Sequence, residues 1–80
     1  MTREEIKRKV NDVFCDVFDD DSIVVTDETT AKDIEDWDSL THITLVSEIE
    51  DVFKIRFSMK EVLGMKNVGE MVDYIARTAE

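Results

Sequence analysis

The sequence predicts an all-α protein: a four-helix bundle with three main helices, a short third helix and a long loop between helices 1 and 2. Three stretches carry apolar side chains at the three- and four-residue spacing of amphipathic helices. The chain has no proline, and the one apolar run that could form a strand has no partner strand. Because no repeat or low-complexity linker interrupts the 80 residues, we expect one domain, residues 1–80.

The first helix begins at a capping box, because Thr2 is followed three residues later by Glu5. We expect this helix to run to about Phe18. Its apolar positions fall on one stripe, formed by Ile6, Val10, Val13, Phe14 and Val17. Cys15 lies off the stripe, and since no second cysteine accompanies it, we predict a small, half-buried side chain without a chemical role.

Residues 19–38 lack helical periodicity and form a long, acidic connection. We expect the run Ile23-Val24-Val25 to pack as a plug under this loop. Lys32 is the only base here among nine acidic residues, which are Asp19, Asp20, Asp21, Asp27, Glu28, Asp33, Glu35, Asp36 and Asp38.

The acidic cluster at the start of this loop does not have the pattern of a calcium-binding EF-hand. The expected glycine is missing, and the twelfth position counted from Asp19 is Thr30 instead of glutamate. We therefore predict no dedicated metal site. Loose binding of divalent cations that relieves charge repulsion stays open as a structural effect.

Three further helices are predicted after the loop. The second covers about residues 39–53, with a stripe of His42, Leu45, Val46, Ile49, Val52 and Phe53. Ser58 and Glu61 form another capping box, and Gly64 supplies a stop, which predicts a helix of one or two turns. Asn67 and Glu70 begin the last helix, whose apolar residues are Val68, Met71, Val72, Ile75 and Ala79.

The charge of the chain limits its partners. Acidic residues outnumber basic ones 20 to 10, so the formal charge of −10 repels nucleic acid and anionic lipid and favours partners with basic surfaces. The single cysteine allows no internal disulfide, which fits a reducing compartment. Residues 1–10 lack an apolar signal-peptide core, and no apolar run is long enough to span a bilayer. We expect a cytoplasmic monomer without a transmembrane segment that binds no nucleic acid.

Ser39 is the leading candidate for a functional hydroxyl. Asp38 can cap the second helix, which places Ser39 in its first turn, where free backbone N–H groups and the helix dipole favour an attached phosphate. The simpler interpretation is that the Asp-Ser pair only caps the helix. Leu40 and Ile43 lie beside Ser39 on the flank away from the core stripe, where they could form a small docking patch.

The second helix resembles the signature of the acyl carrier protein family. The residues that carry the resemblance are Asp38-Ser39-Leu40, Ile43, Leu45, Val46 and the run Glu48-Ile49-Glu50-Asp51-Val52-Phe53-Lys54-Ile55. The resemblance extends over most of the chain, because the helix, the acidic loop, the Asp-Ser-Leu helix, the short helix and the final helix follow the family's order. It implies an acyl-carrier-like fold and a carrier that is not itself an enzyme.

The same resemblance implies a cofactor and partners. A phosphopantetheinyl transferase would move 4′-phosphopantetheine from coenzyme A to Ser39 Oγ, between Asp38 and Leu40, and the terminal thiol would carry acyl groups as thioesters. Acyl-loading and acyl-processing enzymes with basic docking surfaces would be the other partners. In the family, the positions that meet partner enzymes correspond here to Asp38, Leu40, Ile43, Ser47, Glu48 and Asp51, and the core positions correspond to Leu45, Ile49 and Phe53.

Three departures from the family pattern bear on the cargo. Many fatty-acid carriers have an acidic residue just after Asp-Ser-Leu, whereas this chain has Thr41-His42. Trp37 stands where a small residue is common, and Ser47 replaces a frequent apolar contact. Within the family, this combination resembles carriers of polyketide or specialised lipid biosynthesis more than the housekeeping carrier of fatty acid biosynthesis.

Other functions fit the sequence less well. Aminoacyl and peptidyl carriers share the implied fold but usually have glycine where this chain has Asp38. An unmodified acidic adaptor that binds basic proteins through the second helix stays open. A hydrolytic pair of Ser39 and His42 lacks both a Gly-x-Ser-x-Gly context and an orienting acid, so His42 is better interpreted as a buried or half-buried group. Trp37 could pack against the loop and the second helix or contact a partner.

Overall fold

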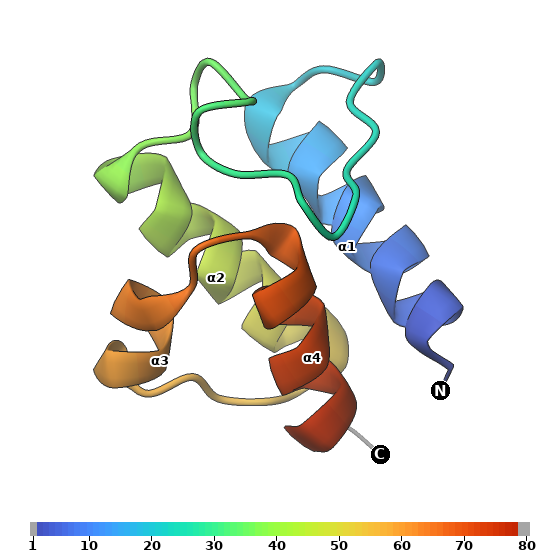
Figure 1. Cartoon of the computed structure of the whole chain (residues 1–80), viewed down its shortest axis with the longest axis vertical. Coiled ribbons are helices and arrows are strands. Elements are labelled where there is room, and N and C mark those ends of the chain that lie inside the picture. The colour runs from blue at the N-terminus through green and yellow to red at the C-terminus, as the bar shows by residue number, and fades with distance from the viewer. Residues whose placement is uncertain (1, 79–80) are drawn as a thin grey trace.

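The computed structural model describes residues 2–78, and in this part of the chain it contains helices and no strands. The helices are α1 (Arg3–Phe18), α2 (Ser39–Phe53), α3 (Met59–Gly64) and α4 (Val68–Thr78). Helix α1 packs against both α2 and α4, while the long loop between α1 and α2 crosses one end of the bundle (Figure 1). The all-α prediction, the element order and the short third helix are confirmed.

The core lies between the three main helices. Each of them contributes most of its predicted apolar stripe, and the connections add Val25, Trp37 and Ile55. Trp37 is 8% exposed, and its ring meets that of Phe14 edge to face, with the centroids 5.1 Å apart. This geometry is favourable for aromatic pairs. Trp37 also contacts His42 of α2, so of its two interpretations the fold shows packing, against α2 as predicted and against α1 in addition.

Asn11 on α1 holds the start of the long loop with two hydrogen bonds. Asn11 donates from Nδ2 to the carbonyl oxygen of Ile23 at 3.1 Å, and its Oδ1 accepts from the N–H of Val25 at 2.7 Å. The amide thus replaces the partner strand that this apolar run lacks. The predicted plug is correct for Ile23 and Val25, which pack on the core, but wrong for Val24, whose side chain is 81% exposed. Alternation along an extended segment turns this middle residue outward.

The same loop is joined to the start of α4 through backbone groups. The N–H of Val68 donates to the carbonyl of Thr29, and the N–H of Gly69 donates to the carbonyl of Asp27, both at 2.9 Å. A Cβ atom on Gly69 would lie 2.8 Å from that Asp27 oxygen. Glycine is therefore required here because the loop backbone approaches α4 too closely for a side chain.

Asp27 pairs with two basic side chains of α1, an arrangement we call the Asp27 clamp. Its Oδ1 lies 3.1 Å from Arg3 Nη2 and 3.2 Å from Lys7 Nζ, and Arg3 is also paired with Asp73 on α4. This oxygen is shut off from solvent, so the two cations balance its charge. Lys7, followed by Arg3, lowers the pKa of the Asp27 carboxyl.

One residue of the predicted core stripe of α2 is exposed. Val52 is 43% exposed, because it lies at the edge of the buried face of α2. Helix α3 ends at Gly64, as predicted, but Gly64 has no positive φ, and the chain leaves the helix through the extended residue Met65. The left-handed positions are instead Asp19 and Lys54, which follow α1 and α2. The predicted core residue Ala79 lies outside the described residues.

Candidate functional site

The N-terminus of α2 is fixed by a reciprocal capping box. The carboxylate of Asp38 accepts hydrogen bonds from the backbone N–H groups of Leu40 and Thr41, both at 3.0 Å. In return, Thr41 Oγ1 accepts from the N–H of Asp38 at 2.7 Å. The Thr41 bond, together with that from Leu40, lowers the pKa of the Asp38 carboxyl. The predicted cap at Asp38 is confirmed. Thr41 completes the capping box, and its part was not predicted from the sequence.

Ser39 follows this cap as the first residue of α2, with an exposed side chain. The helix dipole points its positive end toward the Ser39 hydroxyl. The N–H groups of Leu40 and Thr41, however, are already bonded to Asp38. The electrostatic part of the argument for a phosphate at Ser39 therefore holds, while these two amides are unavailable as direct ligands.

A cavity of about 440 Å³ opens beside Ser39, between α2 and α3. Its walls are mostly apolar, and Lys66 is the one lysine or arginine among them. The residues that line it are Ala31, Trp37, Asp38, Ser39, His42, Ile43, Met59, Val62, Leu63, Met65 and Lys66.

His42 lies in the wall of this cavity with both ring nitrogens engaged. Trp37 Nε1–H donates to His42 Nδ1 at 3.1 Å, and His42 Nε2 lies 3.0 Å from the carbonyl oxygen of Val62. His42 is half-buried, as predicted. Because neither nitrogen is free, the structure gives no support to a hydrolytic pair of His42 with Ser39.

Four large apolar side chains surround the cavity mouth and the Ser39 turn. Leu40 and Ile43 on α2 are 79% and 59% exposed, and Met59 and Leu63 on α3 are 67% and 78% exposed. We call these four residues the apolar rim. The sequence analysis predicted Leu40 and Ile43 as an exposed patch. It missed Met59 and Leu63, although their spacing of four residues on a helix too short to bury both was a usable signal.

The remaining predicted partner positions continue from the apolar rim along α2. Ser47, Glu48 and Asp51 are all exposed. Residues 43, 47 and 51 follow one another at four-residue spacing, so they lie on the same face of the helix. This face combines apolar groups near Ser39 with carboxylates farther along.

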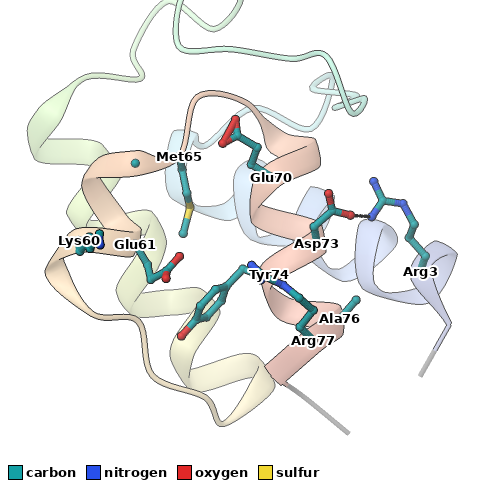
Figure 2. Close-up of a pocket in the computed structure, with 10 residues that line it drawn as sticks. Arg3, Lys60, Glu61, Met65, Glu70, Asp73, Tyr74, Ala76 and Arg77 are labelled. Atoms are coloured by element: carbon teal, nitrogen blue, oxygen red, sulfur yellow. Dashed lines mark hydrogen bonds and ion pairs between the residues drawn. The ribbon is translucent and has the colours of Figure 1, made fainter.

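A larger groove of about 690 Å³ lies between α3 and α4, with Arg3 at its edge (Figure 2). Acidic and basic side chains are mixed in its walls. Tyr74 is the residue with a hydroxyl group in the groove wall. This hydroxyl donates to the carbonyl of Arg56 at 2.8 Å, and the Tyr74 ring stacks on Phe57. Ser39 does not line this groove, so its greater size does not make it the better candidate.

Within residues 2–78, no group of three or more histidine, cysteine or acidic side chains is arranged to hold a metal ion. No helix in the same part of the chain is long and apolar enough to cross a membrane.

Comparison with known families and sequences adds an independent line of evidence. A family model described as "Phosphopantetheine attachment site" matches residues 8–75. The acyl carrier protein of Lactobacillus acidophilus is 32% identical to the chain, with 94% of each covered. That of Streptococcus pyogenes serotype M1 is 37% identical, over 84% of this chain and 86% of the relative.

Solved structures agree with the sequence relatives. The solution structure of a holo acyl carrier protein from Geobacter metallireducens superposes with a TM-score of 0.85 and 43% identity, over 90% of this chain and 83% of that one. An acyl carrier protein from Enterococcus faecalis gives a TM-score of 0.76 and 35% identity, over 99% of this chain and all of the other (100%).

Proposed function

Because the chain belongs to the acyl carrier protein family, whose matched domain is a phosphopantetheine attachment site, we propose that Ser39 is the residue that bears 4′-phosphopantetheine. The arm supplies a terminal thiol that carries acyl groups as thioesters. In this proposal residues 1–80 act as one carrier domain that is not itself an enzyme, and the chemistry on the acyl group belongs to its partners.

The observation that carries the proposal is the position of Ser39 compared with the other serines. Ser39 is exposed, begins a helix and lines the cavity between α2 and α3. Ser22 donates to Asp20 within the loop, and Ser58 caps α3. Ser47 is exposed in the middle of α2 but does not line that cavity. Only Ser39 therefore combines accessibility, a helix N-terminus and an adjacent cavity.

The proposed modification is a phosphoryl transfer with a simple balance. The Ser39 Oγ–H attacks the phosphorus next to pantetheine in coenzyme A, so that an Oγ–P bond forms and the pyrophosphate P–O bond breaks. Adenosine 3′,5′-bisphosphate leaves, and the hydroxyl proton passes to a base of the transferase. The chain itself contributes the nucleophilic oxygen and a rigid helix start that presents it.

The surroundings of Ser39 fit such a group. The positive end of α2 and the Lys66 side chain in the same cavity attract the negative charge of the phosphodiester. The Asp38 carboxylate beside Ser39 repels it. The apolar walls of the cavity suit the arm and the start of an acyl chain. These residues would hold the arm near the protein without a bond beyond that at Ser39.

The proposed partners are a phosphopantetheinyl transferase and enzymes that load and process acyl groups. The apolar rim offers exposed apolar side chains around Ser39 that a bound partner would cover. Glu48 and Asp51 offer negative charge to basic surfaces. Complementary charge raises the association rate more than the final affinity. We therefore propose that α2 is the face on which these enzymes dock.

The test is intact-mass measurement after incubation with coenzyme A, magnesium and a promiscuous transferase. The wild-type chain is expected to gain the mass of one phosphopantetheine, and Ser39→Ala to gain none. Ser22→Ala is the matched control, because it removes another exposed serine hydroxyl, in the loop outside the proposed docking face, and should be modified like the wild type. A wild-type chain that gains no mass contradicts the proposal. The mass of the chain isolated from its host would identify the cargo and so separate fatty-acid from specialised pathways.

A further inference from the structure

Three residues form a hydrogen-bonded chain that fixes the chemical form of His42. The indole N–H of Trp37 can only donate, so His42 Nδ1, 3.1 Å away, must be the acceptor. The carbonyl oxygen of Val62 can only accept, so His42 Nε2, 3.0 Å away, must carry the proton. Together the two bonds select the neutral imidazole with hydrogen on Nε2.

The second of these bonds reaches a helix that has little else to hold it. Helix α3 has six residues, of which Val62 is the buried one. Because α3 ends at Gly64, the carbonyl of Val62 belongs to the last turn, where carbonyl groups lack partners within the helix. His42 supplies the missing donor from α2. The bond therefore joins the backbone of α3 to the helix that bears Ser39.

We propose that His42 is a positioning residue that sets the distance of α3 from α2, and thereby the width of the cavity beside Ser39. In this arrangement Trp37 holds His42 in the tautomer that can donate to Val62. The consequence for an acyl chain in the cavity rests on the proposed function, whereas the arrangement of the three residues does not. The sequence analysis assigned neither Trp37 nor His42 a role.

The inference predicts a dependence on acid. Protonated His42 carries hydrogen on Nδ1 as well, which would point at the indole N–H of Trp37, donor against donor. The charged side chains that line the cavity with His42 are Asp38, which caps α2, and Lys66 between α3 and α4. The other walls, from α3 and from the loop at Ala31, are uncharged. Protonation should therefore weaken the link at Trp37 and loosen α3.

The composition of the chain makes a direct spectroscopic test possible. His42 is the only histidine and Trp37 the only tryptophan, so each gives one unambiguous set of NMR signals. Long-range proton–nitrogen correlation on the unmodified full chain at neutral pH should show the Nε2–H tautomer. A chain that shows the Nδ1–H tautomer, or a rapid mixture of both, overturns the proposal.

Amide hydrogen exchange in the same sample tests the link to α3. In His42→Leu, protection of the α3 amides should fall by about fivefold to tenfold, the effect of one lost hydrogen bond of about 1 kcal/mol. The amides of α4 should keep their protection, which shows that the variant is folded. Unchanged α3 protection in a folded His42→Leu chain contradicts the proposal.

A conservative variant separates positioning from simple packing. In His42→Gln, the side-chain oxygen can accept from Trp37 and the NH₂ group can donate to Val62, and glutamine does not titrate. This variant should retain α3 protection at neutral pH and lose the acid-dependent loosening that the wild type shows. Trp37→Phe keeps the ring contact with Phe14 but removes the donor to His42. In this variant His42 should no longer be held in the Nε2–H tautomer. A glutamine variant as loose as His42→Leu, or as acid-sensitive as the wild type, counts against the role.

The modified chain gives the readout for cargo. Loaded with medium-chain acyl groups, His42→Leu should lose its thioester to hydroxylamine several-fold faster than the wild type, and His42→Gln should not. Equal rates in all three chains contradict the role of the link in sheltering cargo. If Ser39 cannot be loaded at all, the proposed function fails, while the tautomer and exchange measurements still decide the position of α3.

Discussion

The two connections of the bundle differ in a way that their lengths do not suggest. The twenty residues 19–38 between α1 and α2 are held by Asn11, by two backbone bonds to α4 and by the Asp27 clamp. In the shorter segment, Glu50 and Tyr74 hold the residues before α3. Helix α3 itself buries a single residue, Val62, and is joined to α2 by the His42 bond. The long loop is thus a structural part of the core. The short helix, next to Ser39, is the part that can adapt to an arm, a cargo or a partner enzyme.

Of the substitutions that loosen the long loop, Gly69→Ala should lower the free energy of unfolding most. Gly69→Ala puts a Cβ atom 2.8 Å from the Asp27 carbonyl oxygen, so the loop must move away from α4. We expect a loss of about 3 kcal/mol in the free energy of unfolding, at the upper end for overpacking. Denaturation by urea measures it.

Gly64→Ala is the matched control for this substitution. A Cβ atom at Gly64 meets nothing within 4 Å, and its φ is not positive. Since alanine favours the helix over glycine, this variant should be as stable as the wild type or more stable by up to about 1 kcal/mol. Equal losses in the two glycine variants would show that the approach of the loop to α4 is not the cause.

Removing the Asn11 side chain should come next. Asn11→Ala leaves the carbonyl of Ile23 and the N–H of Val25 without their partner, at an expected cost of about 2 kcal/mol. Asp12→Ala, an exposed change one position along the same helix, should cost nothing. Urea midpoints compare the two. A loss in Asn11→Ala no greater than in Asp12→Ala would mean that the loop is not held by this amide.

The Asp27 clamp should appear as a dependence of stability on acid. The folded chain lowers the pKa of Asp27, so the clamp contributes above the ordinary aspartate pKa of about 3.9 and is lost as pH falls through the folded value. Asp27→Asn should therefore lose less stability than the wild type between pH 5 and about 3. Asp21→Asn, a change in the same loop, should follow the wild type. Urea unfolding across this pH range measures the slopes, and identical slopes for all three chains would exclude the clamp.

Added salt should have the smallest effect. The long loop contains nine acidic residues and a single base, Lys32, so moderate salt or divalent cations should raise the melting temperature by screening their repulsion. The same salt weakens the ion pairs of Asp27, but such pairs near the protein surface contribute little to stability. The balance therefore favours stabilisation. A melting temperature that is constant or falls with salt would contradict it.

The sequence predicted local features better than long-range ones. The helix bounds and the cap at Asp38 follow from periodicity and from residues within one turn, so the sequence contained them. The Asn11 bonds join residues 12 and 14 positions apart, and the His42 bond reaches 20 positions to Val62. Such contacts depend on how the helices pack. The need for glycine at position 69 is of the same kind.

The candidate site divides in the same way. Ser39, Leu40 and Ile43 could be identified from one helix, because the core stripe left them outside. Met59 and Leu63 belong to the site only because α3 lies beside α2, which no local pattern states. The resemblance of the Asp-Ser-Leu helix to acyl carrier proteins supplied the function. Geometry added the cavity and the His42 link.

The central claim is that Ser39 carries the arm, and fragmentation of the modified chain tests it most directly. After treatment with coenzyme A and a transferase, tandem mass spectrometry should localise one phosphopantetheine to the peptide that contains Ser39, at Ser39 itself. Ser39→Ala should remain unmodified while Ser22→Ala is modified in full. Modification at another residue, or none on a folded wild-type chain, would contradict the account.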